Sequence, residues 1–97
     1  MFLIGQAFAQ QVPRFDVAEH CETIANVGSY SAAIENACIE QEQSSYNSIK
    51  DSWAAVPEKT RTHCHRIATV GSDSYQILVA CVESELEAIG QKPEFKF

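Results

Sequence analysis

The chain has 97 residues, 45% of them hydrophobic, with four cysteines and a formal net charge of −6 at neutral pH. This length allows one small domain, in which a hydrophobic core alone gives marginal stability and disulfides are expected to add to it. The size excludes a second domain, a Rossmann fold and a TIM barrel. The acidic net charge argues against nucleic-acid binding. No apolar run reaches the roughly 18 to 20 residues of a membrane helix.

The first nine residues, Met1–Ala9, are predicted to be a partial or remnant signal peptide. They are apolar and end in Ala7-Phe8-Ala9, the small-x-small pattern after which signal peptidase cleaves, although a positively charged start is missing. The alternative is an ordinary N-terminal segment. Four cysteines without a CxxC pair favour an oxidising compartment. We therefore expect one helical domain over residues 10–97 in a periplasmic or secreted protein.

A tandem repeat covers most of this domain. The segments His20–Glu42 and His63–Glu85 align at a fixed offset of 43 residues, with 13 identities in 23 positions. The shared pattern is H-C-x2-I-A-x-V-G-S-x-S-x2-I-x2-A-C-x-E-x-E. A period of this length is typical of a helical supersecondary unit, and two units should pack on each other. We place repeat 1 at about 16–56, repeat 2 at about 57–90 and a tail at 91–97.

The first repeat is predicted to be a helical hairpin. Asp16 can cap a first helix over about 17–25, and Gly28 suits the left-handed position that ends such a helix. Two serines that follow the glycine can cap a second, longer helix. Its apolar residues recur at helical spacing until Pro57 stops it, which places Trp53 on this second helix.

The second repeat is predicted to form the same unit. A third helix begins near Glu58 and ends at Gly71, and Asp73 or Ser74 caps a fourth helix that runs to about Ile89. Strand signals are absent from the sequence. We therefore predict an all-α fold of two tandem helical hairpins with four helices.

The cysteines are predicted to pair within each hairpin. Cys21 and Cys38 both lie roughly 10 Å from the bend at Gly28, so they can face each other, and Cys64 and Cys81 stand in the same relation to the second bend. Of three possible connectivities we favour Cys21–Cys38 and Cys64–Cys81, with one disulfide in each hairpin. Each bridge would close a loop that is worth about 3 kcal/mol in the chain-entropy model.

Histidine and glutamate recur at equivalent positions, as His20 with Glu42 and as His63 with Glu85. We favour an ion pair or a helix cap in each hairpin over a metal site, because zinc sites use short chelating spacings that this sequence lacks. A catalytic His–Cys pair would need a free thiol. Nucleotide-binding and haem-attachment motifs are absent. We therefore predict no catalytic residue, no metal ligand, no cofactor and no enzymatic activity.

Three aromatic residues are candidate partner contacts. Phe95 and Phe97 alternate with lysine after Pro93, in a tail too short to bury them alone. We favour a tail that folds back on the helices over one that engages a partner. Trp53 is expected to pack against both hairpins, and it becomes a partner contact if it is exposed instead.

Two segments resemble a known group of sequences. The pattern VGSxSYxxLxxCxxxE around Cys81 and the pattern S-W-x-x-x-P-E-x-T-R-x-x-C from Ser52 to Cys64 resemble an uncharacterised family of small exported four-cysteine tandem-repeat proteins of alphaproteobacteria, many of them from rhizobia. The resemblance covers nearly all of the mature chain. It implies no established activity, cofactor or catalytic residue, so no functional position carries over.

Together these features predict a non-enzymatic periplasmic or secreted interaction module, such as an accessory subunit of a larger envelope protein complex. Its partner would be another protein, with no nucleic acid and no transmembrane span. One alternative is a metal- or small-ligand-binding protein that uses the repeated histidines and glutamates. Another is a small periplasmic stress chaperone, which this chain resembles in size and acidity but not in cysteine pattern.

Overall fold

The computed structural model describes residues 11–97, so the predicted cleavage site after Ala9 lies outside the described residues. Over this range the chain forms four α-helices and one short 3-10 helix, with no strand. The elements are α2 (Val17–Ala25), α3 (Ala32–Ile49), η1 (Trp53–Ala55), α4 (Glu58–Ala68) and α5 (Tyr75–Gly90). The prediction of an all-α fold is confirmed.

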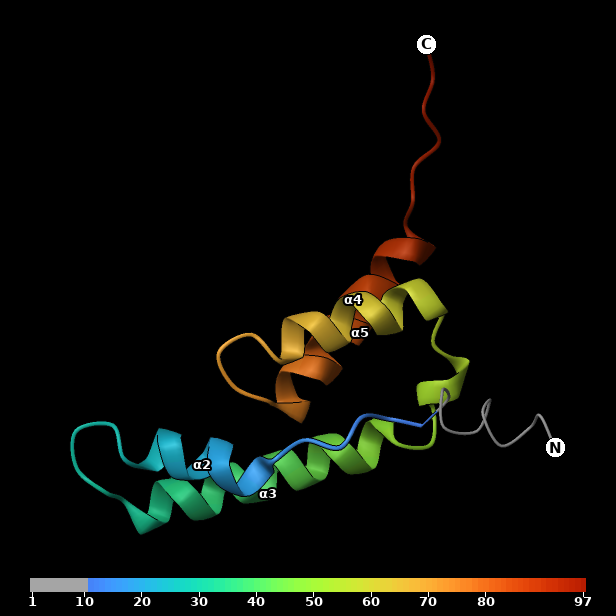
Figure 1. Ribbon diagram of the computed structural model, residues 1–97. Coiled ribbons are helices and arrows are strands. Elements are labelled where there is room, and N and C mark those ends of the chain that lie inside the picture. Colours follow the sequence, from blue (N-terminus) through green and yellow to red (C-terminus); the bar gives the residue numbers. More distant parts are fainter. Residues whose placement is uncertain (1–10) are drawn as a thin grey trace, which may run out of the picture.

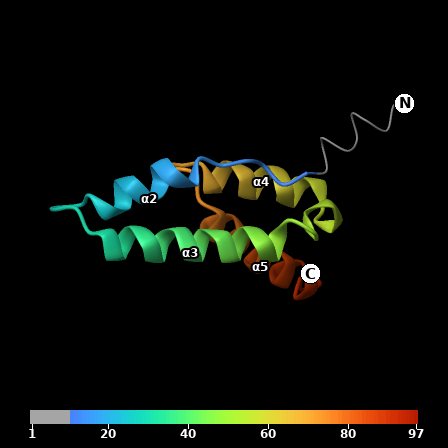
Figure 2. The same ribbon diagram turned by 90° about the horizontal axis from the view of Figure 1, so that it is seen from below.

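The helices form two antiparallel pairs, hairpin 1 (α2 and α3) and hairpin 2 (α4 and α5). The hairpins pack on each other through α3 and α5, and the link that contains η1 joins them at one end (Figure 1). The segment before α2 runs beside α4 (Figure 2), where the ring of Phe15 lies 5.8 Å from that of His65. This segment therefore adds a second connection between the two hairpins.

A glycine allows the chain to reverse in each hairpin. Gly28 has a φ of +82° and Gly71 a φ of +84°, values that are strained for residues with a side chain. In the first bend the Ser31 N–H donates to the Ala25 carbonyl at 3.0 Å, and an equivalent bond closes the second bend. The repeated sequence thus produces the same backbone turn twice.

Side-chain caps fix where three of the helices begin. The Asp16 carboxylate accepts from an N–H in the first turn of α2. The Ser31 hydroxyl accepts from the Ile34 N–H at 3.1 Å, and the Ser74 hydroxyl accepts from the Ile77 N–H at 3.3 Å. These serines occupy equivalent positions in the two repeats, so α3 and α5 begin in the same way.

One disulfide closes each hairpin. Cys21 is bonded to Cys38 and Cys64 to Cys81, and the Cα atoms of both pairs lie 5.5 Å apart. The predicted connectivity is therefore confirmed. All four thiols are used in these bonds.

The main core lies between the two hairpins. Its buried apolar residues come from the N-terminal segment, the end of α3, the link and both helices of hairpin 2: Val12, Ile49, Trp53, Val56, Cys64, Ala68, Tyr75, Leu78 and Val82. In the rest of hairpin 1, the buried hydrophobic residues are Cys21 and Ala25. The outer half of hairpin 1 therefore depends on its disulfide more than on apolar packing.

The second helix is shorter than predicted. It ends at Ile49, and Trp53 lies on the separate 3-10 helix rather than on a helix that continues to Pro57. Residues 44–52 are rich in serine, asparagine and aspartate, whose side chains compete for backbone groups and weaken a helix. The residue before Pro57 is extended, as proline requires of its predecessor. The break turns the Trp53 side chain into the core, where it is 3% exposed and unavailable to a partner.

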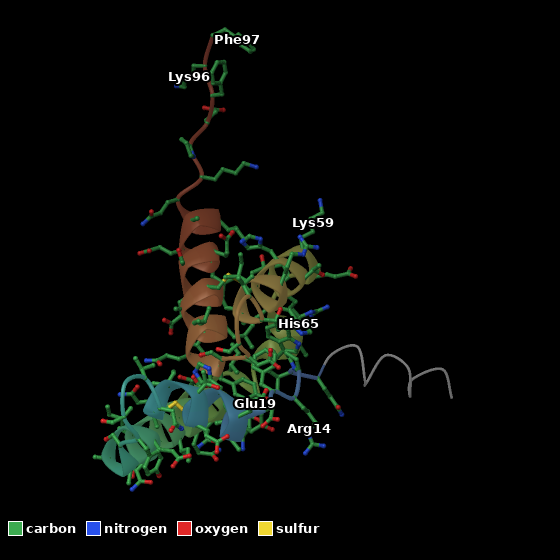
Figure 3. All side chains as sticks on the ribbon, turned by 60° about the vertical axis from the view of Figure 1, so that its left-hand side comes forward. Arg14, Glu19, Lys59, His65, Lys96 and Phe97 are labelled. Atoms are coloured by element: carbon green, nitrogen blue, oxygen red, sulfur yellow. A yellow bond between two sulfur atoms is a disulfide. The ribbon has the colours of Figure 1, made fainter. Side chains whose placement is uncertain are left out.

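The tail does not fold back on the helices, contrary to the prediction. It points away from both hairpins in Figure 1, and Figure 3 shows Lys96 and Phe97 at its far end. Phe95 and Phe97 are exposed, and their rings contact each other at 4.9 Å between centroids. The core is already filled by the link and by α5, so two phenyl rings on a charged segment gain too little burial to offset the entropy of ordering it.

A bilayer span would need a helix longer and more apolar than any found within residues 11–97.

Candidate functional site: the two histidine–glutamate faces

Glu42 caps α5 from the neighbouring hairpin. Its Oε1 accepts from the Tyr75 N–H at 2.6 Å, and its Oε2 accepts from the Ser74 hydroxyl at 2.7 Å and from the Gln76 N–H at 3.4 Å. The Ser74 hydroxyl in turn accepts from the Ile77 N–H. The first three N–H groups of α5, which have no partner inside the helix, are therefore all satisfied.

The Glu42 carboxylate is only 1% exposed. Among the described residues it makes no salt bridge to lysine or arginine, and its nearest cationic candidate is a histidine. Three donors and the positive end of the α5 dipole compensate its charge instead. Burial of a carboxylate is costly without such partners, so this contact requires hairpin 2 to sit where it does.

His20 completes the contact between the hairpins. Its Nδ1 lies 2.7 Å from the Ser72 hydroxyl in the bend of hairpin 2, and its Nε2 lies 3.7 Å from Oε2 of Glu42. The repeat predicted the pairing of His20 with Glu42, and the structure places the two side by side. We call the arrangement of His20 and Glu42 around Ser72, Ser74 and the first turn of α5 the clasp.

The clasp places serine, histidine and glutamate in the order of a hydrolytic triad, but its geometry favours a structural role. The separation of 3.7 Å between His20 and Glu42 is longer than a hydrogen bond. Both Glu42 oxygens accept from the first turn of α5, so the carboxylate is not free to orient the imidazole as a triad acid does. The side chains therefore hold two hairpins together.

Metal binding receives little support from this region. Within residues 11–97 no three histidine, cysteine, aspartate or glutamate side chains converge as a metal site requires. Each histidine–glutamate pair offers two ligands at most, and disulfide-bonded cysteines supply no thiolate.

The second histidine–glutamate pair has the same geometry but a different environment. Nε2 of His63 lies 3.8 Å from Oε2 of Glu85, and the two side chains are 49% and 44% exposed. They border an open depression of about 500 Å³ on hairpin 2, with Ile67 and Ile77 in its wall. The sequence predicts both pairs, but it does not indicate that hairpin 2 covers one pair and leaves the other open.

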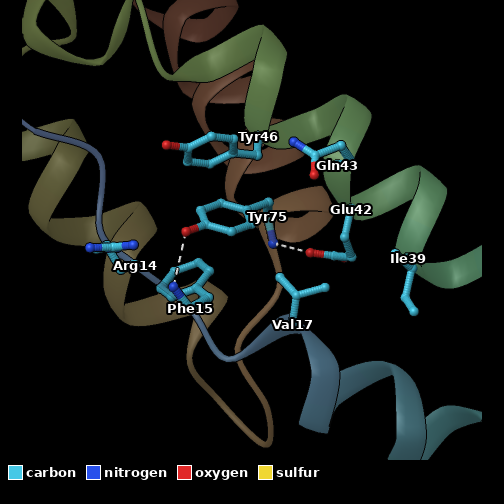
Figure 4. A pocket seen from close by; sticks show the side chains of 8 residues that line it. All are labelled: Arg14, Phe15, Val17, Ile39, Glu42, Gln43, Tyr46 and Tyr75. Atoms are coloured by element: carbon cyan, nitrogen blue, oxygen red, sulfur yellow. Dashed lines mark hydrogen bonds between the residues drawn. The ribbon is translucent and has the colours of Figure 1, made fainter.

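A cavity of about 300 Å³ adjoins the clasp (Figure 4), between the segment before α2, α3 and the start of α5. Its lining residues are Arg14, Phe15, Val17, Ile39, Glu42, Gln43, Tyr46 and Tyr75. The Tyr75 hydroxyl donates to the Pro13 carbonyl at 2.6 Å and accepts from the Phe15 N–H at 2.9 Å. Burial raises the pKa of Tyr75, and the Phe15 N–H partly opposes this effect.

The sequence analysis did not identify Ser72 or Tyr75 as members of this site. Ser72 belongs to the repeated pattern, which is a signal that could have found it, whereas Tyr75 stands at a position that is occupied by alanine in repeat 1. Its contacts with Phe15 and Tyr46 join segments far apart in the chain, with ring centroids 4.6 and 5.0 Å from its own. Only the tertiary structure shows them.

Each hairpin also exposes the same three apolar side chains near its bend. They are 41–80% exposed, and all six are identities of the repeat. We call these sets the bend patches: Ile24, Val27 and Ile34 on hairpin 1, and Ile67, Val70 and Ile77 on hairpin 2.

Comparison of the chain with protein-family models, with curated proteins and with solved structures found no match.

Proposed function

We propose that the protein is a non-enzymatic interaction module that acts in the periplasm or as a secreted protein, as an accessory subunit of a larger envelope assembly. Its two disulfides are typical of proteins outside the reducing cytosol. The bend patches are the observation that carries the proposal. Clusters of exposed apolar residues mark interaction sites in folded proteins, and here the same set recurs near both bends, with Ile67 and Ile77 bordering one depression on hairpin 2.

A disulfide lies close to each bend patch and restrains the two helices that carry its isoleucines. On hairpin 1, Ile24 and Ile34 lie about one helical turn from the bridge between Cys21 and Cys38, on the side of the bend. A partner that binds such a surface has little side-chain or loop motion to arrest, so more of the contact contributes to affinity. Hairpin 2 repeats this arrangement.

The polar groups also favour binding over catalysis. The cysteines are disulfide-bonded, and the Glu42 carboxylate and the Ser74 hydroxyl serve as caps for α5. The cysteines, Glu42 and Ser74 therefore stabilise the fold.

The test is a double variant, Ile34→Ser with Ile77→Ser. We expect the tagged wild-type protein to copurify a reproducible set of envelope proteins after cross-linking, and we expect the variant to lose that set while its thermal midpoint is unchanged. Ile89→Ser is the matched control, because Ile89 is also exposed on α5 but lies outside the bend patches. Retention of the full set by the double variant would contradict the proposal.

The tail is a second candidate contact. Phe95 and Phe97 remain exposed, so deletion of Lys92–Phe97 should leave the thermal midpoint unchanged. Loss of copurified proteins from this truncation would identify the tail as a docking peptide. Full retention would remove Phe95 and Phe97 from the set of partner contacts.

A further inference from the structure

We infer that the exposed His63–Glu85 face of hairpin 2 binds the start of α3 in a second copy of this chain. The contact would repeat, between molecules, the clasp that joins the two hairpins within one molecule. This inference rests on the proposed role as an interaction module, and it names one of the partners.

The acceptor side of this contact is already formed. His63 and Glu85 are separated by 3.8 Å, and the equivalent His20 and Glu42 by 3.7 Å. In hairpin 1 this pair binds two serine hydroxyls and two helix N–H groups. In hairpin 2 the same pair is about half exposed beside an open depression. The second face is therefore an equivalent acceptor that hairpin 1 of the same chain does not cover.

The donor side is the first turn of α3. Ser29 and Ser31 are the repeat counterparts of Ser72 and Ser74 in the clasp. The N–H groups of Ala32 and Ala33 correspond to the two N–H groups of α5 that donate hydrogen bonds to Glu42. The Ser31 hydroxyl accepts a hydrogen bond from the Ile34 N–H, as the Ser74 hydroxyl does from the Ile77 N–H at the start of α5. Within residues 11–97, no carboxylate accepts from Ala32 or Ala33, and both residues are exposed. The donors that the acceptor face needs are thus present and accessible.

Charge is unevenly distributed over the two hairpins. Residues 15–46, which include most of hairpin 1, contain six acidic residues and no lysine or arginine. Residues 50–66, which include most of α4, contain four lysine or arginine residues and two acids, a net charge of +2. The bend and α5, residues 69–90, add four acidic residues and no lysine or arginine, so hairpin 2 as a whole is also acidic. Charge therefore adds no long-range attraction between hairpin 1 and hairpin 2, which is a further reason to expect weak association.

The contact between molecules should be weaker than the clasp. Tyr75 fills an aromatic site beside Phe15 and Tyr46, whereas its counterpart in hairpin 1 is Ala32. Association should therefore require high protein concentration. Each molecule has one donor end and one acceptor face, so the contact is head-to-tail and continues along a row of molecules.

The experiment is sedimentation equilibrium of the purified full chain from about 10 µM to about 1 mM, the range of weak association. We expect the average mass of the wild type to rise with concentration. Glu85→Arg disables the acceptor face, and Ala32→Glu places a carboxylate opposite Glu85 while remaining favourable for the start of a helix. Each variant alone should associate at least about tenfold more weakly.

Mixing the two variants gives the decisive result. Glu85→Arg keeps its donor end and Ala32→Glu keeps its acceptor face, and the two substituted positions carry opposite charges. An equimolar mixture should therefore regain the association that each variant alone has lost. Glu87→Arg and Ala37→Glu are controls of matched charge. Their counterparts in the other hairpin, Ser44 and Ala80, are exposed and therefore lie outside the clasp. Both controls should associate like the wild type.

Two results would overturn the inference. One is a wild-type protein that stays monomeric across the whole range. The other is association that survives in both Glu85→Arg and Ala32→Glu, including a dimer that only Ile34→Ser with Ile77→Ser abolishes. Neither result bears on copurification of envelope proteins, and loss of that copurification leaves the sedimentation result untouched. The two proposals can therefore fail separately.

Discussion

Glu42 and Glu85 occupy equivalent positions in the two repeats, yet they contribute differently to the stability of the fold. Glu42 is buried and satisfies the start of α5, whereas the Glu85 side chain is 44% exposed and paired with His63. Removal of a buried acceptor leaves its donors without partners, and that cost exceeds the value of an exposed ion pair. Equivalent substitutions in the two repeats should therefore have unequal effects.

We predict that Glu42→Ala lowers the free energy of unfolding by about 3 kcal/mol, because the buried Ser74 hydroxyl and Tyr75 N–H and the partly buried Gln76 N–H lose their acceptor. Glu85→Ala should lower it by at most about 1 kcal/mol, since the exposed pair is screened by solvent. Urea unfolding followed by circular dichroism measures both values. Equal losses for the two variants would show that the clasp does not stabilise the fold.

Tyr75 makes stability depend on pH in the alkaline range. Burial raises its pKa above the ordinary value of about 10, because the folded protein disfavours the phenolate. The unfolded chain therefore loses the phenolic proton at lower pH than the folded protein does. The stabilisation is fully present below pH 10 and declines as the pH rises through the pKa of the folded state.

We predict that the wild type loses stability as the pH rises above about 10 and that Tyr75→Phe loses less over the same range. At pH 8 the variant should be less stable by about 1 to 3 kcal/mol, because the Pro13 carbonyl and the Phe15 N–H lose their partner. Urea unfolding at several pH values measures this dependence, and absorbance at 295 nm follows the phenolate. Parallel stability curves for the two proteins would refute the assignment.

The two hairpins differ in how much they rely on their disulfides. Cys64 belongs to the main core, whereas the outer half of hairpin 1 buries little besides Cys21 and Ala25. Each bridge should contribute about 3 kcal/mol in the chain-entropy model. The loss of one bridge should nevertheless destabilise a different length of chain from the loss of the other.

We predict that Cys21→Ala with Cys38→Ala increases hydrogen exchange mainly over residues 22–37, because the end of hairpin 1 can open without the rest of the fold. Cys64→Ala with Cys81→Ala should lower protection throughout the chain and reduce the thermal midpoint further. Hydrogen exchange monitored by mass spectrometry, together with calorimetry, separates local from global opening. Identical exchange maps for the two double variants would contradict this division.

At the scale of the whole molecule, one tryptophan joins the link to the core between the hairpins. Trp53 is buried together with Ile49 and Val56, and the break after α3 is what turns it inward. The folded state therefore depends on a residue that belongs to neither hairpin.

We predict that Trp53→Ala lowers the free energy of unfolding by about 3 to 5 kcal/mol. The thermal midpoint should then fall by more than about 10 °C in a domain of this size. Phe97→Ala is the control, because Phe97 is fully exposed and should leave the midpoint unchanged. A blue-shifted tryptophan emission that moves to longer wavelength on unfolding would confirm the burial of Trp53 independently.

Features that depend on short stretches of chain could be predicted from the sequence alone. A glycine at each bend, a serine cap at the start of α3 and of α5, and cysteines at matched distances from each bend define two hairpins and their disulfides without reference to anything distant. The pairing of each histidine with its glutamate also follows, because both residues lie at fixed positions within one hairpin.

The differences between the two equivalent hairpins arise from tertiary contacts. The inward turn of Trp53 and the exposure of the tail depend on what the core between the hairpins can accommodate. The burial of Glu42 depends on the bend of hairpin 2, which is more than thirty residues away along the chain. A repeated sequence specifies two identical faces, but one hairpin in a two-hairpin chain covers one of them and leaves the other open, so equivalent residues acquire different environments.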